Sequence, residues 1–431
     1  MKAVIIGNHA AGLTAAETLR QGDPKMEIVV ISNENTPPYS RCLIPYLVSG
    51  EKSLQDILFK SPDFYRQNDI EALLGAEVVK VLPKDKRVLL ADGKNVDYDV
   101  LIIASGGTPT MPRLPGVENQ GVFGFRTLDD AQRISAYCDK VETVVVLGGG
   151  LVGLKAAVAL QRRGKKVKLV VGSPNVLSQI VGPIEATAFE QKLADLGIEV
   201  ILRTNPALIL GQGRAEGVET TEGRQLPCQM VVVGKGVDAN MAMVKGTEVK
   251  TQYGIVVDEC CRTSVPDIYA AGDVAQSRDD VRKQKWMNCL WPHAAEEGRV
   301  AAENILGHKS VLRKRTSMNS FVVGDLAMIT CGLTGAREEV PGSEELSVKG
   351  PGRLDRKRFV LKDNCLVGFA LVGNVAHAGV LTSLVTKGVD VSSVRNQLLA
   401  GQYDFASLLP LVARNRQAFS EPEYEEVLGF F

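Results

Sequence analysis

The N-terminal part of the chain alternates short apolar runs with segments that place apolar residues at helical spacing. Ala3 to Ile6 has the pattern of a buried strand, Leu13 to Leu19 has the apolar period of a helix, and Glu27 to Ser32 alternates β-branched residues like a second strand. A helix between two such strands is typical of a β-α-β unit, which predicts a parallel sheet.

The same order of elements recurs further along the chain. Thr143 to Leu147 is an apolar strand pattern, Leu154 to Gln161 is an Ala-rich helical segment, and Val167 to Val171 is again strand-like. In both units a glycine-containing turn follows the first strand. Two such units predict two dinucleotide-binding modules.

Strand patterns outside these units indicate how the two modules divide the chain. Tyr98 to Gly106 resembles a buried strand that ends in small residues, and a Pro-rich crossover runs from Pro109 to Pro115. Beyond the strand pattern Gln229 to Val233, the segment Ile255 to Asp273 is predicted as strand, turn and strand, which would return the chain to its first module. The expected units are a discontinuous first module at 1–110 and 235–311 and a second module at 111–234.

After about residue 312 the pattern changes to short strands and helical segments. This predicts a small C-terminal α+β unit over 312–431, which would serve either as a homodimer interface or as a docking face for a partner. The segment 341–352 is rich in Pro, Gly and Glu and is predicted to be an exposed loop. The predicted strands are Arg358 to Leu361 and Leu366 to Val372, and the predicted helical segments are Val380 to Thr386 and Val394 to Leu399.

Composition and charge narrow the range of partners. A chain of 431 residues is too long for one ordinary core, and its 50 basic residues balance its 50 acidic residues. No overall field therefore draws it to nucleic acid or to an anionic membrane. The first strand pattern begins at Ala3, which leaves no room for a signal peptide, and no apolar run is long enough to span a bilayer. We expect a soluble cytoplasmic protein.

The eight cysteines are scattered and form no C-x-x-C pair. This argues against a disulfide scaffold, and equally against a zinc or iron–sulfur site held by this chain. We expect no metal site, so any iron–sulfur cluster would belong to a partner. His293 and His377 are expected to be packing or interface residues, because no second ligand stands at a recognisable spacing.

The glycine-rich turn of the second unit carries the strongest binding signal. Gly148, Gly150 and Gly153 form G-x-G-x-x-G between a strand and a helix, with Leu151 and Val152 inside the motif. The missing side chains allow the backbone to approach a pyrophosphate at the positive N-terminus of the helix. This turn is therefore the predicted pyrophosphate site of the second module.

The first unit carries an altered copy of this motif. It is Gly7-Asn8-His9-Ala10-Ala11-Gly12, with His9 where the middle glycine is expected. A Cβ atom at this position crowds a bound phosphate unless the backbone stands back or the imidazole turns outward. The spacing leaves two roles open for His9, a tolerated loop residue or a catalytic one. The candidate dinucleotide contacts are Gly7, His9, Ala10, Ala11 and Gly12.

An acid at the end of the second strand of such a module holds the adenosine ribose. In the first module Glu34, with Ser32 nearby, is the candidate. In the second module the corresponding region, Val170 to Ser173, has neither an acid that favours NAD nor an arginine for the extra phosphate of NADP. Ser173 and Gly234 are candidate contacts there, and the choice between NAD(H) and NADP(H) stays open.

Two further segments complete a family resemblance. Ala104, Ser105 and Gly106 end one strand pattern, and Thr263 to Asp273 is TSVPDIYAAGD. With the two glycine motifs, these segments resemble the FAD-dependent pyridine nucleotide-disulfide oxidoreductase family over nearly the whole chain. The resemblance implies an α/β fold with two Rossmann-like modules, the first for FAD and the second for NAD(H) or NADP(H). It also implies that Asp273, which follows Gly272, hydrogen-bonds the ribityl chain of FAD.

Other segments resemble the branch of the family that contains NADH oxidases, rubredoxin reductases and the flavin module of nitrite reductase. They are Pro38 to Cys42, Arg126 to Ala131 and Trp291 to Ala294. The resemblance implies that the first segment lies beside the isoalloxazine, where Arg41 would support negative charge on reduced flavin. The alternative is a solvated arginine in a Pro-rich turn. The candidate cofactor contacts in these segments are Arg41, Cys42, Arg126, Pro292 and His293.

Cys42 and Lys155 are further catalytic candidates, beside Arg41. Family members that reduce coenzyme A disulfides, persulfides or oxygen use one cysteine near Cys42, although the neighbouring residues here differ. Arg41 would help to lower the pKa of this thiol, and a buried, idle thiol is the alternative. Lys155 stands where relatives often carry a glutamate that reaches toward the nicotinamide and the flavin. It would pair with flavin or carboxamide groups, or else cover apolar neighbours on the helix surface.

These features predict an FAD-dependent NAD(P)H oxidoreductase without the double-cysteine motif of disulfide reductases. The first hypothesis is electron exchange between NAD(H) and an iron–sulfur protein, as the FAD/NAD-reducing subunit of a multisubunit oxidoreductase that oxidises, for example, an aldehyde or a 2-oxo acid. The second is a free-standing NADH oxidase or coenzyme A disulfide or persulfide reductase that uses Cys42. The third is a flavin-bearing structural or regulatory subunit, which the altered residues His9, Val171 and Lys155 keep open.

Overall fold

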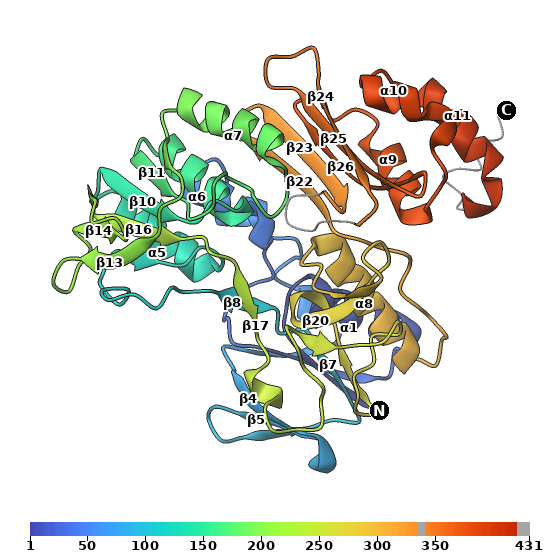
Figure 1. Cartoon of the computed structure of the whole chain (residues 1–431). Helices are drawn as coiled ribbons and strands as arrows, with labels where there is room; N and C mark the ends of the chain where they lie inside the picture. The colour runs from blue at the N-terminus through green and yellow to red at the C-terminus, as the bar shows by residue number, and fades with distance from the viewer. Residues whose placement is uncertain (335–340, 420–431) are drawn as a thin grey trace.

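Three five-stranded sheets organise the part of the chain that the structure describes (Figure 1). The computed structural model describes residues 1–334 and 341–419. Two of the sheets are parallel, and the third, near the C-terminus, is antiparallel. This arrangement confirms the predicted fold class of two Rossmann-like modules followed by a small α+β unit. The residues of the predicted C-terminal unit at 335–340 and 420–431 lie outside the described residues.

The first parallel sheet draws strands from two separate parts of the chain. Its order, β19-β7-β1-β2-β3, places the late strand β19 beside β7. The chain therefore returns to this sheet after it has built the second one, while the limits 1–110 and 235–311 stay predictions. The strands are β1 (Lys2–Ile6), β2 (Glu27–Ser32), β3 (Glu71–Leu74), β7 (Val100–Ile103) and β19 (Ile268–Ala270).

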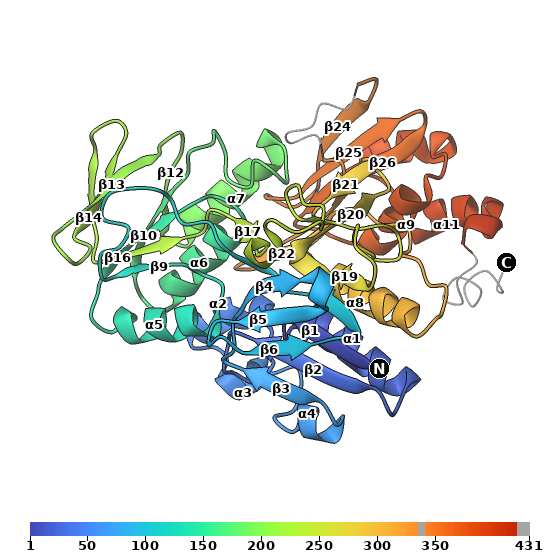
Figure 2. The same ribbon diagram turned by 90° about the horizontal axis from the view of Figure 1, so that it is seen from below.

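Helices cover one face of this sheet and a small antiparallel sheet covers the other (Figure 2). Helices α1 (Ala10–Gly22) and α8 (Trp291–Ile305) approach so closely that a Cβ atom on Gly298 would lie 2.1 Å from the carbonyl oxygen of Ala11. On the other face, Val81 and Val88 pack in one cluster with residues of β1, β2 and β7. The small sheet consists of β4 (Val78–Leu82), β5 (Arg87–Leu90) and β6 (Asn95–Asp97).

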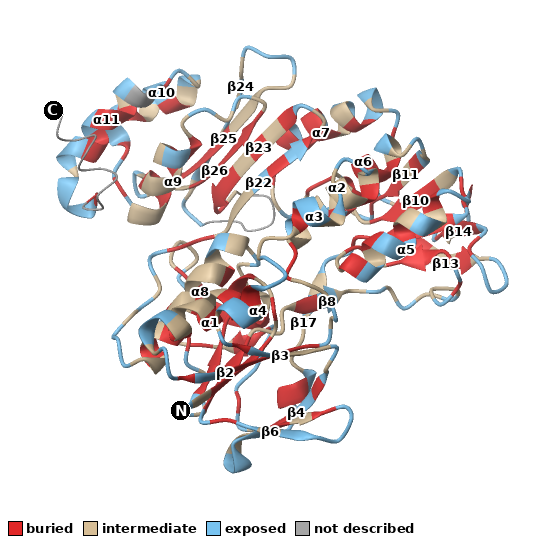
Figure 3. Cartoon of the chain, turned by 180° about the vertical axis from the view of Figure 1, so that it is seen from behind, coloured by how far each residue is buried: buried red, intermediate tan, exposed pale blue. Residues whose placement is uncertain are grey.

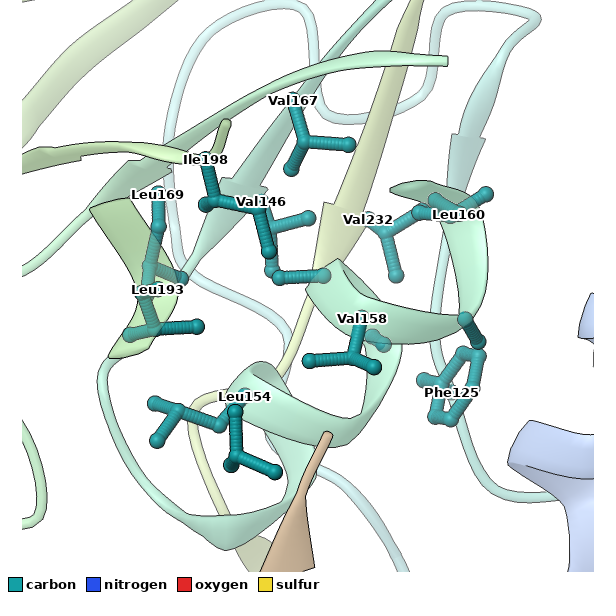
Figure 4. Packing of buried hydrophobic residues seen from close by; sticks show 14 of the residues in the cluster. Phe125, Val146, Leu154, Val158, Leu160, Val167, Leu169, Leu193, Ile198 and Val232 are labelled. Atoms are coloured by element: carbon teal, nitrogen blue, oxygen red, sulfur yellow. The ribbon is translucent and has the colours of Figure 1, made fainter. Parts of the chain in front are cut away.

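The second parallel sheet has the order β12-β11-β10-β16-β9 and is layered in the same way. In Figure 4, Val158 and Leu160 of α6 lie beside Val146 and Val232 of the sheet. The opposite face packs against the antiparallel strands β13 (Pro206–Leu210), β14 (Gly217–Thr220) and β15 (Gln225–Pro227). The elements of the main layers are β9 (Val122–Phe123), β10 (Thr143–Leu147), β11 (Lys166–Val170), β12 (Glu199–Ile201), β16 (Met230–Val233), α5 (Leu128–Cys138), α6 (Leu151–Arg162) and α7 (Pro183–Asp195).

The C-terminal antiparallel sheet is packed on both faces. One face contacts α7, where the rings of Phe189 and Phe321 lie 6.0 Å apart. The other face is covered by three helices, and Figure 3 shows buried residues along the strands between these layers. The elements are β22 (Met318–Val323), β23 (Leu326–Gly332), β24 (Glu344–Lys349), β25 (Arg356–Lys362), β26 (Cys365–Val372), α9 (Ala378–Lys387), α10 (Arg395–Ala400) and α11 (Phe405–Arg414).

The segment 341–352 is not the exposed loop that its composition predicts. It contains the edge strand β24, in which Leu346 pairs with Phe359 and Val348 with Lys357 of β25. Apolar residues alternate with Glu, Ser and Lys in this strand, as suits a half-exposed edge. The charged residues therefore belong to an edge strand, and Glu345 pairs with Arg358 of the neighbouring strand β25.

Short elements complete the structure near the edge where the two modules meet. Strand β8 (Gly107–Pro109) leaves the first module and pairs with β17 (Val237–Ala239), which returns to it. Within the described residues, no helix has the length and apolar character needed to cross a membrane. Further short elements are the 3-10 turns η1 (Arg41–Leu43) and η4 (Gly272–Val274), the helix α2 (Ile44–Ser49) and the strand β20 (Ala275–Asp279).

Candidate functional site

A cavity of about 570 Å³ opens at the carboxyl ends of β1, β2 and β7, and we call it the central cavity. Open α/β sheets bind ligands at this edge. The cavity also includes residues that were not predicted as contacts, among them Asn8, Thr108, Asn240, Cys289 and Trp291. Of the predicted contacts it brings together Gly7, His9, Ala10, Ala11, Ser32, Glu34, Arg41, Cys42, Ala104, Ser105, Gly106, Arg126, Gly272 and Asp273.

Two glycines allow the strand, turn and helix at the cavity wall to pack closely. Gly7 has φ +121°, and a Cβ atom there would lie 2.1 Å from the carbonyl oxygen of Ala104. A Cβ atom on Gly12 would lie 1.9 Å from the carbonyl oxygen of Gly7. Gly12 thus supports the turn from behind and does not itself line the cavity.

Glu34 stands at the centre of a polar network in this cavity. Its Oε2 accepts a hydrogen bond from the Tyr39 hydroxyl at 2.5 Å, and its Oε1 pairs with Arg41. Burial raises the pKa of the carboxyl, but the contacts with His9, Arg41 and Tyr39 outweigh it and lower the pKa to about 2. Glu34 is therefore ionised, and three side chains of the protein already surround it.

Tyr39 extends this network into the second module. Its hydroxyl accepts a hydrogen bond from the backbone N–H of Leu128, the first residue of α5, at 2.9 Å. The side chain is fully buried. The sequence motif that contains Tyr39 suggested a flavin contact, and the Leu128 partner, far away in the chain, could not be seen from spacing.

Asp273, the predicted ribityl ligand, lies on η4 and pairs with the second module. Its Oδ2 accepts a hydrogen bond from Arg126 Nη2 at 2.7 Å. The preceding Gly272 has φ +80°, and its N–H donates to Glu297 Oε2 at 2.7 Å. Arg126 Nε is buried without a hydrogen-bond partner among the described residues. The pair brings a carboxylate and a guanidinium together at one wall of the cavity.

Cys42 faces the central cavity from η1. Burial is the main cause that raises the pKa of its thiol, and the Asp273 carboxylate adds to the effect. The positive charges of Lys155 and Arg126 act in the opposite direction without reversing it. Cys289, on the same cavity, has a pKa raised to about 12 by burial and by Asp273. Both thiols are therefore protonated near neutral pH.

Lys155 lies on α6 where three parts of the molecule meet. Its Nζ is 5.3 Å from the ring centroid of Tyr46, on α2, and 5.4 Å from that of Phe321, on β22. Cation–π contacts of this kind hold an ammonium group in place while leaving its N–H donors available. The two aromatic neighbours come from α2 and from the C-terminal sheet. A lysine on the outer surface of a helix would not have such neighbours.

The glycine motif of the second module has the geometry that its spacing predicts. A Cβ atom on Gly153 would lie 1.8 Å from the carbonyl oxygen of Gly148, and one on Gly148 would lie 2.4 Å from that of Gly234. A Cβ atom on Gly150 would meet nothing within 4 Å. The remaining predicted contacts lie at the same sheet edge: Leu151 and Val152 begin α6, and Ser173 follows β11.

Pro292 and His293 do not line the central cavity, although their neighbours Trp291 and Ala294 do. Burial, helped by Arg315, lowers the pKa of His293 to about 4. His377 is the N-cap residue of α9, and the centroid of its ring lies 6.1 Å from that of Tyr403. Among the residues that the structure describes, no group of His, Cys, Asp and Glu could hold a metal ion.

Comparisons with known proteins identify the family and the fold. A protein of Methanocaldococcus jannaschii named NADH oxidase is 34% identical over 343 residues, which are 78% of this chain and 76% of that protein. Subunit epsilon of the NADH-dependent phenylglyoxylate dehydrogenase of Aromatoleum evansii is 29% identical over 406 residues, which are 93% of this chain and 94% of that subunit. The crystal structure of the covalent putidaredoxin reductase–putidaredoxin complex has the same fold, with a TM-score of 0.86 at 22% identity, covering 96% of this chain and 99% of that one.

The residues of the central cavity fit FAD. The cavity reaches the N-terminus of α1, where the first backbone N–H groups have no partner within the helix, and the buried His9 and Arg126 nitrogens lack hydrogen-bond partners within the described residues. Residues 1–298 match the family described as pyridine nucleotide-disulphide oxidoreductase. The chain therefore belongs to this family, and it is an FAD-dependent NAD(P)H oxidoreductase, as predicted.

Proposed function

We propose that this chain moves electrons between NAD(H) or NADP(H) and an iron–sulfur protein partner. It would act as the FAD/NAD-reducing subunit of a cytoplasmic multisubunit oxidoreductase, for example one that oxidises an aldehyde or a 2-oxo acid. Support comes from the phenylglyoxylate dehydrogenase subunit, which this chain matches over nearly its whole length. Phenylglyoxylate is itself a 2-oxo acid.

The observation that carries this proposal is the full-length match to that subunit, and the state of Cys42, which faces the cavity, adds to it. A thiol transfers electrons as a thiolate, and burial together with Asp273 raises the pKa of this one. The pKa of the Cys289 thiol is also raised, to about 12. Electrons are therefore expected to leave the protein without passing through a cysteine, which favours a one-electron carrier over a disulfide or persulfide as the acceptor.

The residues around the cavity divide the remaining tasks. FAD, when bound, exchanges electron pairs with the nicotinamide and single electrons with a partner. Gly150 and the N-terminus of α6 would bind the coenzyme pyrophosphate. The guanidinium of Arg41, held by Glu34, and the ammonium of Lys155 would stabilise negative charge that develops on reduction.

Anaerobic stopped-flow absorbance of the FAD-loaded protein tests this proposal. NADH or NADPH is mixed with the protein first, and a ferredoxin, oxygen or coenzyme A disulfide is added afterwards in separate runs. We expect rapid bleaching of the flavin and fast reoxidation only by the ferredoxin. Reoxidation by oxygen or by the disulfide at a comparable rate would contradict the proposal.

The second candidate function is a free-standing NADH oxidase or coenzyme A disulfide or persulfide reductase. Its specific support is that Cys42 faces the cavity with the positive charges of Lys155 and Arg126 nearby. In this case a Cys42→Ser variant would still accept electrons from NADH but would not turn over. If the iron–sulfur proposal holds, the same variant keeps its rate of ferredoxin reduction within about twofold.

A further inference from the structure

The two modules carry different residues at the N-cap position of the helix that follows the glycine-containing turn. His9 is the N-cap residue of α1 and Gly150 is the N-cap residue of α6, and both have extended backbone conformations. Beside Gly150 the space where a side chain would begin is open for 4 Å. In the first module this position carries an imidazole that lines the central cavity. The position at which a glycine leaves room for a phosphate is thus occupied by the His9 imidazole, a group that can form hydrogen bonds.

The imidazole of His9 has unused hydrogen-bonding capacity. Both ring nitrogens are buried and have no hydrogen-bond partner among the described residues. Glu34 is the acid beside it, with Oε1 3.7 Å from His9 Nε2, a distance at which the two groups attract each other electrostatically without forming a short hydrogen bond. The ring is held edge-on against Tyr39, with centroids 4.9 Å apart. A buried N–H group without a partner is destabilising, so a ligand that accepts its hydrogen bond gains affinity.

From this arrangement we infer that His9 donates a hydrogen bond to the pyrophosphate of FAD. The first N–H groups of α1, from Ala10 onward, have no partner within the helix and provide the positive end of its dipole. His9 lies at the same helix end and adds a side-chain donor to these backbone donors. It thus replaces the close backbone approach that a glycine allows with a direct side-chain contact.

The neighbouring charges fit this role. Glu34 is bound to Arg41 and Tyr39, so its oxygens are already engaged. Arg41 and Arg126, the other charged groups that face His9, add positive potential around the site of the pyrophosphate. The inference depends on FAD binding by the family and not on the identity of the partner protein.

FAD affinity of the apoprotein tests the inference without any turnover. FAD binding is followed by flavin fluorescence, and ADP and adenosine are measured as competitors of FAD, so that only the central cavity is probed. We expect His9→Gly, which restores the family's glycine, to weaken FAD and ADP about 10-fold or more. Adenosine, which lacks phosphate, should compete equally well against both proteins.

Two further variants separate a specific contact from a general disturbance. His9→Gln keeps an N–H donor and should bind FAD within about threefold of the wild type. His308→Gln alters an exposed histidine and should change nothing. Equal or tighter FAD binding by His9→Gly would overturn the inference, and so would an equal loss for adenosine. Circular dichroism confirms that each variant is folded.

Discussion

At the scale of single residues, Gly150 and Gly153 show that glycines of one motif have different tasks. A Cβ atom on Gly153 would collide with a backbone carbonyl at 1.8 Å, whereas one on Gly150 would enter open space. Gly150 therefore leaves room for a ligand, and Gly153 allows the helix to pack on the strand. The motif alone shows the spacing and does not show which glycine does which.

Alanine substitutions at these two positions separate the two tasks. Gly153→Ala must displace the turn from the helix, so we expect the free energy of unfolding to fall by about 3 kcal/mol. Gly150→Ala should change it by less than about 1 kcal/mol but raise the KM for NADH. Urea unfolding and steady-state kinetics with an artificial acceptor measure both effects. Equal losses of stability in the two variants would contradict this division.

The lowered pKa of Glu34 leads us to predict that the free energy of unfolding depends on pH. In the folded chain it lies at about 2, below the ordinary value of 4.5, so the ionised carboxylate stabilises the fold above about pH 4.5. Glu34→Gln should lower the free energy of unfolding of the apoprotein by roughly 2–4 kcal/mol at neutral pH. This cost should shrink as the pH falls from about 4.5 toward 2, where the wild-type carboxylate also becomes protonated.

Urea unfolding between about pH 3 and pH 7 measures this cost. The exposed Glu118→Gln serves as the control, because it alters a glutamate outside the cavity. A difference between wild type and Glu34→Gln that stays constant down to pH 3 would show that the contacts of the carboxylate are not ionic. The pH dependence therefore tests the network of His9, Arg41 and Tyr39 around it.

At the scale of elements, α8 holds the loop that carries Asp273. Glu297 is buried on this helix and accepts hydrogen bonds from the Gly272 N–H at 2.7 Å and the Ser277 hydroxyl at 2.9 Å. It also pairs with the buried Arg315. One carboxylate thus joins α8, η4, β20 and the segment that leads into the C-terminal sheet.

Substitution of Glu297 should weaken the contacts that hold η4, and with it Asp273, at the FAD site. Glu297→Gln replaces one accepting oxygen with an NH2 group, which leaves Arg315 or Gly272 without an acceptor. We expect a loss of about 3 kcal/mol in the free energy of unfolding and weaker FAD binding. On the same helix, Glu303→Gln breaks a more exposed pair with Arg299 and should cost less than about 1 kcal/mol. Thermal unfolding and flavin titration would show no difference between the two variants if the buried contacts were unimportant.

The limits of prediction from the sequence follow from these elements. Buried parallel strands and their glycine turns were predictable because their periodicity is local. Strand β24 was missed because charged residues on an edge strand resemble those of a loop. Glu297, and the Tyr39 bond to Leu128, were missed because their partners lie far away in the chain. The aromatic neighbours of Lys155 were missed for the same reason, because they come from two other parts of the chain.

At the scale of the whole molecule, one buried arginine joins the second module to the C-terminal sheet. Arg358, on β25, pairs with Glu345 on β24 and lies 3.8 Å from Glu185, a fully buried residue of α7. Ser347 also contacts Glu185, at 3.1 Å. This face of the sheet is therefore fixed to the second module and is not available to a homodimer or a partner.

Removal of this arginine should uncouple the unfolding of the two units. Arg358→Met leaves Glu185 as a buried charge without compensation, which should lower the free energy of unfolding by about 3–5 kcal/mol. The control, Lys192→Met, breaks a pair with the exposed Asp325 and should lower it by less than about 1 kcal/mol. Both tryptophans, Trp286 and Trp291, lie before the C-terminal sheet, so their fluorescence reports on the first module and circular dichroism on the whole chain. In urea the two signals should change together in the wild type and in Lys192→Met, and should separate in Arg358→Met because the C-terminal sheet unfolds first. Coincident transitions in all three proteins would mean that apolar packing, such as that of Phe189 on Phe321, couples the units without help from the buried charges.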